Sequence, residues 1–273
     1  MALILFIISV AGNPGNGFYA YYPPRPAAKE PAYIRLPRTG ASMNKSQCIA
    51  VWGGIVKQTK AKPGGGWIKQ IPKSRYREDQ LIYEMFFASR TQPGVFLEIG
   101  GYDGLGESNS IFFERCLGWH GMLVEANPLA FDLLVKNRPS AHNLLMAPSC
   151  LSSEHPVRIL AYGSTNAAIT DYASKGSNLV HCGPLGPQLL RINMTRINFF
   201  SLDVENHELD VLRTIDFTQI HIDVIMVESQ NANNRGGNSR ANVKIREYMA
   251  ARGYRAILNK IKASDVFVLT SQH

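Results

Sequence analysis

One short segment constrains the fold more than any other part of the chain. Residues 94–99, GVFLEI, form an apolar run that follows Pro93 and ends at the glycine-rich stretch GGYDGLG, residues 100–106. The pattern of residues 107–116 predicts a helix. A short apolar run that leads through glycines into a helix is typical of a buried strand beginning a βα unit. The segment therefore predicts an α/β protein.

The same unit repeats along the rest of the chain. Six further apolar runs predict strands at 121–124, 143–147, 197–202, 222–227, 254–258 and 265–269. Between them, helical patterns cover residues 128–136, 207–214 and 242–251. Strands that alternate with helices form parallel sheets with helices on both faces. We therefore expect a doubly wound, mostly parallel sheet of seven strands.

The positive charge of the chain is confined to its N-terminal third. The formal net charge is +8, but residues 1–93 hold 13 Lys and Arg against 4 acids, and the remaining 180 residues hold 16 against 17. Pro/Gly clusters interrupt the same third and leave no regular period. We expect an irregular basic extension over residues 21–75, in weak contact with a membrane or another acidic surface, before a nearly neutral domain at 76–273.

The beginning of the chain, residues 1–20, has its own character. Residues 1–11 are almost wholly apolar, too few to span a bilayer but enough for the core of a signal peptide. This favours the secretory pathway or secretion; the alternative is a buried strand in a cytoplasmic protein. Four widely spaced cysteines without metal-site spacing would be disulfides or buried thiols: Cys48, Cys116, Cys150 and Cys182.

Acidic residues mark the strand ends where α/β sheets bind their ligands. Glu98 and Asp103 flank the first glycine turn, and Glu125 ends the second predicted strand. The turn departs from the G-x-G-x-x-G spacing of dinucleotide sites. A carboxylate at Asp103 would repel a phosphate at about 4 Å by roughly 4 kcal/mol at an effective dielectric of 20. The same carboxylate would attract a cation.

S-adenosylmethionine is a cationic ligand of the required kind, with a sulfonium, an ammonium and a ribose diol but no phosphate. Glu98 and Asp103 suit its amino-acid end, and Glu125 is placed to accept hydrogen bonds from both ribose hydroxyls. Gly100, Gly101 and Gly104 would let the backbone approach the ligand. Either glutamate alone would be read as an ordinary solvated strand end, but the joint pattern favours a cofactor site.

Several longer stretches carry a family resemblance. They are FLEIGGYDG (96–104), SNSIFFERCLGWHGMLVEANP (108–128), LVKNRP (134–139), SLDVENHELDVLRTIDF (201–217), IDVIMVES (222–229) and DVFVLT (265–270). Together they resemble the FkbM-type methyltransferases, from about Tyr76 to Thr270. The resemblance implies a class I methyltransferase fold, S-adenosylmethionine as cofactor and methyl transfer to an oxygen. It also places Ala126 and the pair Ser149 and Cys150 at the cofactor, the pair near the adenine ring.

One position departs from the family pattern. The family usually has glycine where this chain has Asn206. Asparagine tolerates a left-handed backbone better than most residues, so we expect the turn to be retained.

The residues after the fourth predicted strand are the candidates for catalysis. A hydroxyl acceptor must lose a proton, and four residues lie where a base is needed: Asp203, Glu205, His207 and Glu208. Histidine is the only residue type among them whose unperturbed pKa suits a base near neutrality, which favours His207, although these residues could simply cap the following helix. Asp203 is also a candidate cofactor contact. Asp203, Glu205 and Glu228 could hold Mg²⁺, but no spacing demands it, and we predict no metal.

The acceptor is expected to be a small molecule or a glycan, with a sugar or small-molecule alcohol as the methylated group. Two polar stretches, 163–187 and 231–238, are expected to form part of its pocket and a lid. The alternatives are a non-catalytic interaction protein that retains the fold and a nucleic-acid methyltransferase. The basic extension lacks the interleaved aromatic residues of RNA-binding modules, so we predict no nucleic-acid partner.

Overall fold

An eight-stranded mixed sheet forms the centre of the protein. The computed structural model describes residues 20–23, 46, 48–49, 74–152, 156–162, 166–170, 177–229 and 239–270. The expectations for the apolar N-terminus, for most of the basic extension and for the segment 231–238 concern residues outside these ranges.

Seven of the strands are those predicted from the apolar runs. In sheet order they are β4 (His142–Leu145), β3 (His120–Glu125), β2 (Val95–Ile99), β8 (Arg196–Leu202), β9 (His221–Glu228), β11 (Ser264–Leu269) and β10 (Tyr254–Ile261). The first five are parallel to one another, and β11 runs antiparallel to both of its neighbours. The strand order reverses beside β2, which places the ligand-binding crevice at the carboxyl ends of β2 and β8.

The eighth strand corrects the expected count. β1 (Ala20–Tyr22) pairs antiparallel with β4 at the edge of the sheet, although its last two residues fall in the extension predicted to be irregular. Tyr22 packs on Phe131 with ring centroids 5.8 Å apart. Pairing with β1 satisfies the backbone groups at the open edge of β4. A strand of three residues is too short to be recognised as a pattern in the sequence.

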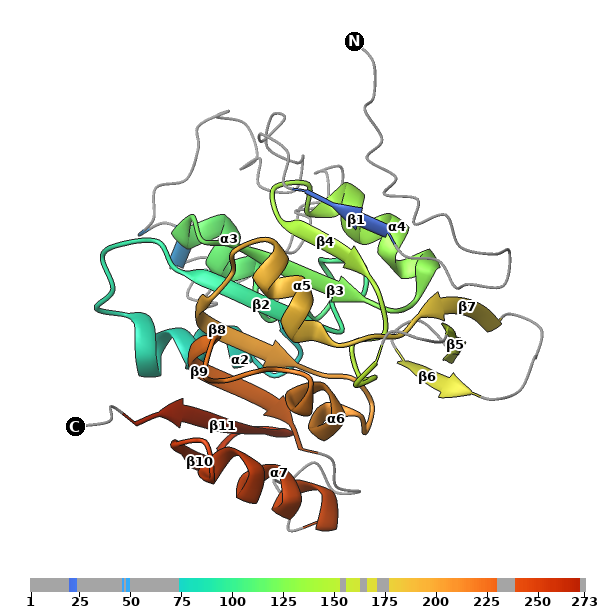
Figure 1. Cartoon of the computed structure of the whole chain (residues 1–273). Helices are drawn as coiled ribbons and strands as arrows, with labels where there is room; N and C mark the ends of the chain where they lie inside the picture. Colours follow the sequence, from blue (N-terminus) through green and yellow to red (C-terminus); the bar gives the residue numbers. More distant parts are fainter. Residues whose placement is uncertain are drawn as a thin grey trace, which may run out of the picture.

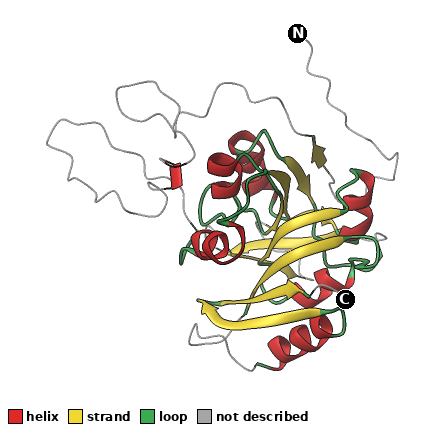
Figure 2. Cartoon of the chain, turned by 90° about the vertical axis from the view of Figure 1, so that its left-hand side faces the viewer, coloured by secondary structure: helices red, strands yellow, loops and turns green. Residues whose placement is uncertain are grey.

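Helices cover both faces of the sheet, as predicted (Figures 1 and 2). One face carries α2 (Glu78–Ile82) with its π-helical continuation η1 (Tyr83–Phe87), α3 (Ile111–Leu117) and α4 (Pro128–Asn137), and the other carries α5 (Leu185–Arg191), α6 (Glu208–Arg213) and α7 (Arg240–Ala250). Successive strand residues alternate between the two cores: Phe96 packs with the first helix set and Leu97 with the second. Among the described helices, none is both long and apolar enough to cross a bilayer.

The polar stretch between β4 and β8 contains more structure than the sequence indicates. It forms a small antiparallel sheet of β5 (Pro156–Tyr162), β6 (Asn166–Thr170) and β7 (Ser177–His181), followed by α5. This sheet lies beyond the carboxyl ends of the parallel strands (Figure 1). The question of the cysteines is also answered: Cys48 pairs with Cys116, and Cys150 pairs with Cys182.

A buried arginine joins the first glycine turn to the neighbouring helices. The guanidinium of Arg138 is fully buried and donates to Glu114 Oε2 at 2.6 Å and to the carbonyl of Gly104 at 3.1 Å. It also donates to the hydroxyls of Ser108 and Ser110 at 3.1 and 3.0 Å. Burial alone would raise the pKa of Glu114, but Arg138 and Ser140 hold that pKa below its ordinary value.

The two serines belong to a turn that delays the start of α3. The helix begins at Ile111 rather than near residue 107, because Glu107 has a left-handed backbone (φ 58°) and the next residues bind Glu98. The carboxylate of Glu98 accepts from the hydroxyls of Ser108 and Ser110 and from the Asn109 amide. Glu98 and Arg138 therefore share the same two serines.

Arg138→Met should destabilise the protein by about 3–5 kcal/mol, because it leaves Glu114 buried without its partner. Urea unfolding followed by circular dichroism measures the change in the free energy of unfolding. Arg255→Met, at an exposed position on β10, is the control and should change it by less than about 0.5 kcal/mol. Equal losses in the two variants would contradict the role of Arg138.

Candidate functional site

A cavity opens at the carboxyl ends of β2, β3, β8 and β9. It contains about 1110 Å³ of space, its open mouth included. Nine of the residues singled out in the sequence line this main cavity: Glu98, Gly100, Glu125, Ala126, Ser149, Asp203, Glu205, His207 and Glu228. They come from stretches up to about a hundred residues apart in the chain, which the parallel strands bring to one edge of the sheet.

Four of the predicted cofactor residues do not line the main cavity: Gly101, Asp103, Gly104 and Cys150. The carboxylate of Asp103 accepts hydrogen bonds from the amides of Leu105 and Gly106 at 2.8 and 2.7 Å, so its contacts are within the turn. A Cβ at Gly104 would stand 2.6 Å from Cγ of Arg138, and one at Gly101 would stand 2.8 Å from Leu134. These glycines allow the turn to pack against α4.

Gly100 is the glycine that shapes the main cavity. Its φ is +83°, and a Cβ there would lie 2.0 Å from the carbonyl oxygen of Asp203. A side chain at this position would therefore force the glycine turn away from the end of β8. The absence of one leaves the backbone of the turn exposed to the cavity.

Glu125 lies at the end of β3 with its carboxylate fixed by the backbone. One oxygen accepts from the Tyr102 amide and the other from the Asn127 amide, both at 2.7 Å. Burial raises the pKa of this carboxyl, and the backbone hydrogen bonds oppose that rise. Each oxygen retains a lone pair for a further donor, such as one hydroxyl of a ribose diol.

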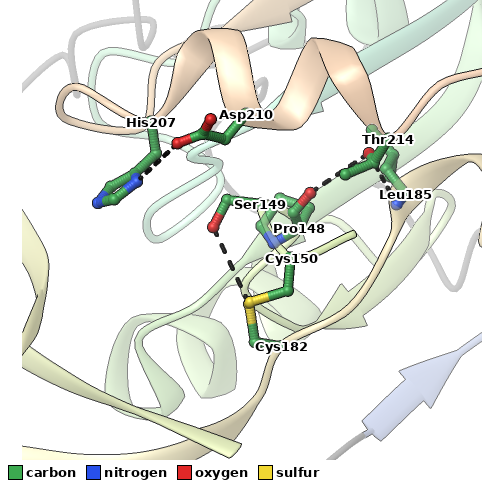
Figure 3. The surroundings of a disulfide bond; sticks show 8 residues. All are labelled: Pro148, Ser149, Cys150, Cys182, Leu185, His207, Asp210 and Thr214. Carbon is green, nitrogen blue, oxygen red and sulfur yellow. Dashed lines mark hydrogen bonds and ion pairs between the residues drawn. A yellow bond between two sulfur atoms is a disulfide. The ribbon is translucent and has the colours of Figure 1, made fainter. Parts of the chain in front are cut away.

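The wall beyond Glu125 is built by the chain that follows β4. Met146, Ala147, Pro148 and Ser149 line it, together with Ile159 of β5. The Cys150–Cys182 disulfide joins this wall to the end of β7, and Figure 3 shows it beside Ser149, with His207 and Asp210 on the neighbouring segment. The amide of Ala147 also donates to the carbonyl of His181 at 3.0 Å. The small sheet is thus fastened to the cavity by a covalent bond and by the backbone.

Three carboxylates gather at the ends of β8 and β9. Oxygens of Asp203, Glu208 and Glu228 lie within 4.8 Å of one another, close enough to share a proton or a divalent cation. Desolvation raises the pKa of Asp203 well above its ordinary value, and the charge of Glu228 and a hydrogen bond to it add to the rise. The trio differs from Asp203, Glu205 and Glu228, the set that the sequence suggested as possible Mg²⁺ ligands.

The backbone explains why Glu208 replaces Glu205 in the trio. Glu205 and Asn206 both adopt left-handed conformations, with φ of 53° and 80°, which confirms the expectation for Asn206. This turn carries the chain back so that Glu208 accepts from the amides of Val204 and Asn206, both at 3.2 Å. Glu205 still lines the main cavity, but outside the cluster.

His207, the residue before α6, also lines the main cavity. Its Nδ1 lies 3.5 Å from Oδ2 of Asp210, and about two fifths of its side chain is exposed. His207 and Asp203 thus both line the main cavity.

Sequence reasoning missed several lining residues. Asn109 Nδ2 donates to the hydroxyl of Ser201 at 3.0 Å, and both side chains line the main cavity together with Arg75. Asn109 and Ser201 lie in two of the resembling stretches, one directly after the glycine turn and one near a strand end. Both residues could have been predicted from these positions, because the carboxyl ends of parallel strands and the turns that follow them meet at one edge of the sheet.

A second cavity adjoins the first. This side cavity contains about 610 Å³, its mouth included, and has six lining residues in common with the main cavity: Arg75, Glu107, Asn109, Ser201, Asp203 and Glu228. Tyr76 and Glu78, together with Ala263 and Ser264 from the β10–β11 turn, complete its far side. The acid cluster therefore stands between two connected spaces.

Comparison with known proteins decides the family. Residues 98–256 match the Methyltransferase FkbM domain. The chain belongs to the FkbM methyltransferase family. It is a class I methyltransferase domain, and S-adenosylmethionine is its cofactor.

Solved structures with a similar chain path share little sequence with this FkbM domain. A TehB-like SAM-dependent methyltransferase from Corynebacterium glutamicum is 12% identical, with 72% of this chain and 89% of that one covered at a TM-score of 0.41. An O-methyltransferase from Bacillus cereus in complex with SAH is 13% identical, with 87% of this chain and 94% of that one covered at a TM-score of 0.39. An Aeropyrum pernix fibrillarin with natively bound S-adenosyl-L-methionine is 11% identical, with 65% of this chain and 67% of that one covered at a TM-score of 0.38. No curated protein matches the chain.

The main cavity fits the cofactor of the FkbM family. Gly100 lines it with backbone alone, and Glu125 offers paired carboxylate oxygens to a ribose diol. The wall of Met146, Ala147 and Ile159 is apolar, as an adenine ring requires. No phosphate-binding spacing is present, in agreement with a ligand that has no phosphate.

Glu125→Gln should weaken the binding of S-adenosylmethionine by about 10–100-fold, because a charge-assisted pair of hydrogen bonds becomes neutral and single. Isothermal titration calorimetry with the cofactor measures the affinity. Asp132→Asn, at an exposed position of α4, should leave the affinity unchanged. A loss of less than threefold in Glu125→Gln would contradict the ribose assignment.

Replacing both cysteines of the Cys150–Cys182 pair by serine should also weaken cofactor binding, because the wall at Ser149 loses its covalent attachment to β7. The matched control replaces Cys48 and Cys116, whose disulfide joins α3 to residue 48 and lines neither cavity. Calorimetry on both double variants tests this. An equal loss of affinity in the two would mean that disulfides act only through general stability.

Proposed function

We propose that this methyltransferase transfers a methyl group to the oxygen of a hydroxyl-bearing acceptor, a sugar or another small-molecule alcohol. The observation that carries the proposal is the carboxyl of Asp203, which lines both cavities and stands beside Glu228. A hydroxyl must lose its proton as it accepts a methyl group, and a carboxylate at this junction can receive that proton.

S-adenosylmethionine supplies a methyl group activated by a sulfonium. The protein holds that cofactor through Glu125, through the backbone at Gly100 and through the apolar wall after β4. Orienting the acceptor oxygen in line with the methyl group accounts for most of the rate in such a displacement. The raised pKa of Asp203 makes its carboxylate a stronger proton acceptor than an ordinary aspartate. Glu205 and His207 line the same space and are positioned to contact the acceptor.

Incubation with methyl-labelled S-adenosylmethionine and a cell extract tests the reaction. We expect label in small molecules or glycans as alkali-stable methyl ethers. Label in methyl esters, methylamines or nucleic acid would overturn the proposal. Tight cofactor binding with no labelled product at all would instead favour the non-catalytic interaction protein.

Asp203→Asn should lower methyl transfer by about 100-fold, within the range for loss of a general base. The same variant should be more stable at pH 8 by about 1 kcal/mol, because it removes a desolvated carboxylate that stands beside the like charge of Glu228. The folded state raises the pKa of Asp203, so its stabilising contribution is complete below pH 3.8 and is lost as pH rises through the raised pKa. The difference in Tm between variant and wild type should therefore increase with pH, and thermal unfolding at pH 4.5 and 8 measures it. A constant difference would contradict the assignment.

We also propose that the protein works in an oxidising compartment, in keeping with the apolar first residues of the chain. The two disulfides support this, because structural disulfides persist in the secretory pathway and are rare in the cytosol. Alkylation of free thiols in freshly lysed cells tests it. Modification of all four cysteines without prior reduction would overturn it.

A further inference from the structure

The side cavity reaches the site of methyl transfer from the end opposite the adenine wall. The main cavity extends from Met146 and Ser149 past Glu125 to Asp203 and Glu228, and the side cavity continues from that last pair. A cofactor in the main cavity with its ribose at Glu125 leaves the side cavity free. An acceptor that enters there meets the methyl group at the acid cluster.

Acidic groups outnumber basic groups around the side cavity. Its described lining includes the carboxyls of Glu78, Glu107, Asp203 and Glu228 and a single basic residue, Arg75. Nε of Arg75 lies 3.9 Å from Oε1 of Glu107, so the carboxylate of Glu107 offsets the positive charge of Arg75.

Lys262, which does not line the side cavity, contacts one of its lining residues. Nζ of Lys262 is 4.0 Å from the ring centroid of Tyr76, so that ring engages it. An anionic acceptor would therefore enter a side cavity whose charged groups are mostly negative, like the acceptor itself.

The polar atoms that lack partners at the junction are hydrogen-bond acceptors. Oδ1 of Asn109 is buried and receives no hydrogen bond from the described residues. Oε2 of Glu228 is also buried. While the neighbouring carboxyls are ionised, none of the described residues donates a hydrogen bond to it. Both residues line the two cavities. A ligand that satisfies them must bring donors, and neighbouring hydroxyls on one molecule would supply two.

We propose that the side cavity is the acceptor subsite and that it selects a polyhydroxylated molecule without acidic groups, such as a neutral or amino sugar. This inference rests on the proposed function and specifies its substrate class. The carboxyls exclude sugar phosphates and uronic acids by charge, and Asn109 and Glu228 bind hydroxyls adjacent to the one that is methylated.

The test separates the extract by charge before the reaction. Acceptors are divided on an anion exchanger into retained acidic compounds and unretained neutral and basic ones, and each pool is incubated with the full-length protein and labelled cofactor. We expect at least tenfold more label in the unretained pool. Label mainly in acidic compounds, or none in the unretained pool from a protein that binds the cofactor, would overturn the inference.

The chemical form of the label keeps the two proposals apart. Methyl ethers on acidic compounds would support the proposed function and overturn the subsite inference. Methylamines on neutral or basic compounds would support the subsite and overturn the proposed function.

A variant provides an independent readout. Glu78 lines only the side cavity, where its carboxylate accepts from the Tyr76 amide at 2.7 Å. Glu78→Gln should raise the ratio of acidic to neutral labelled products by roughly threefold and leave the affinity for S-adenosylmethionine unchanged. Glu84→Gln, at an exposed position in η1, should change neither. An unchanged product ratio in folded Glu78→Gln would contradict the role of charge.

Discussion

The buried contact of Arg138 and Glu98 with the same two serines is the interaction on which the site depends. Ser108 and Ser110 donate to Glu98 and accept from Arg138, so a strand end, the start of α3 and the end of α4 are fixed relative to one another. A buried guanidinium is costly unless its donors are matched, and here they are, by Glu114, a backbone carbonyl and the serines. The glycine turn that shapes the cofactor cavity is one side of this arrangement.

The acid cluster, in contrast, lowers the stability of the folded protein. Asp203, Glu208 and Glu228 gather like charges where a structural core would avoid them, and desolvation raises the pKa of Asp203. Backbone amides, those of Val204 and Asn206 among them, compensate the carboxylate of Glu208 in part. Local conflict of this kind is expected at functional sites, where reactivity is maintained at some loss of stability. In this methyltransferase it lies where the main cavity and the side cavity meet.

The sequence predicted most of the central sheet because its signals are local. Seven apolar runs of strand length, separated by helical patterns, correspond to seven of the eight strands, and the acids at their ends mark the site. The misses are long-range. β1 is three residues held by the open edge of β4, and Glu208 enters the acid cluster through a left-handed turn. Asp103, predicted to contact the cofactor, accepts hydrogen bonds from the amides of Leu105 and Gly106 in its own turn, a local contact that the sequence pattern does not reveal.

By itself the sequence determined the α/β class, the family resemblance and the edge of the sheet at which the main cavity lies, because strand periodicity and glycine turns act over a few residues. Only the tertiary structure decided which cysteines pair, which acids meet and that a second, acidic cavity adjoins the first. These depend on side chains separated by tens of residues and brought together by strand order and buried polar contacts. No local pattern records those distances.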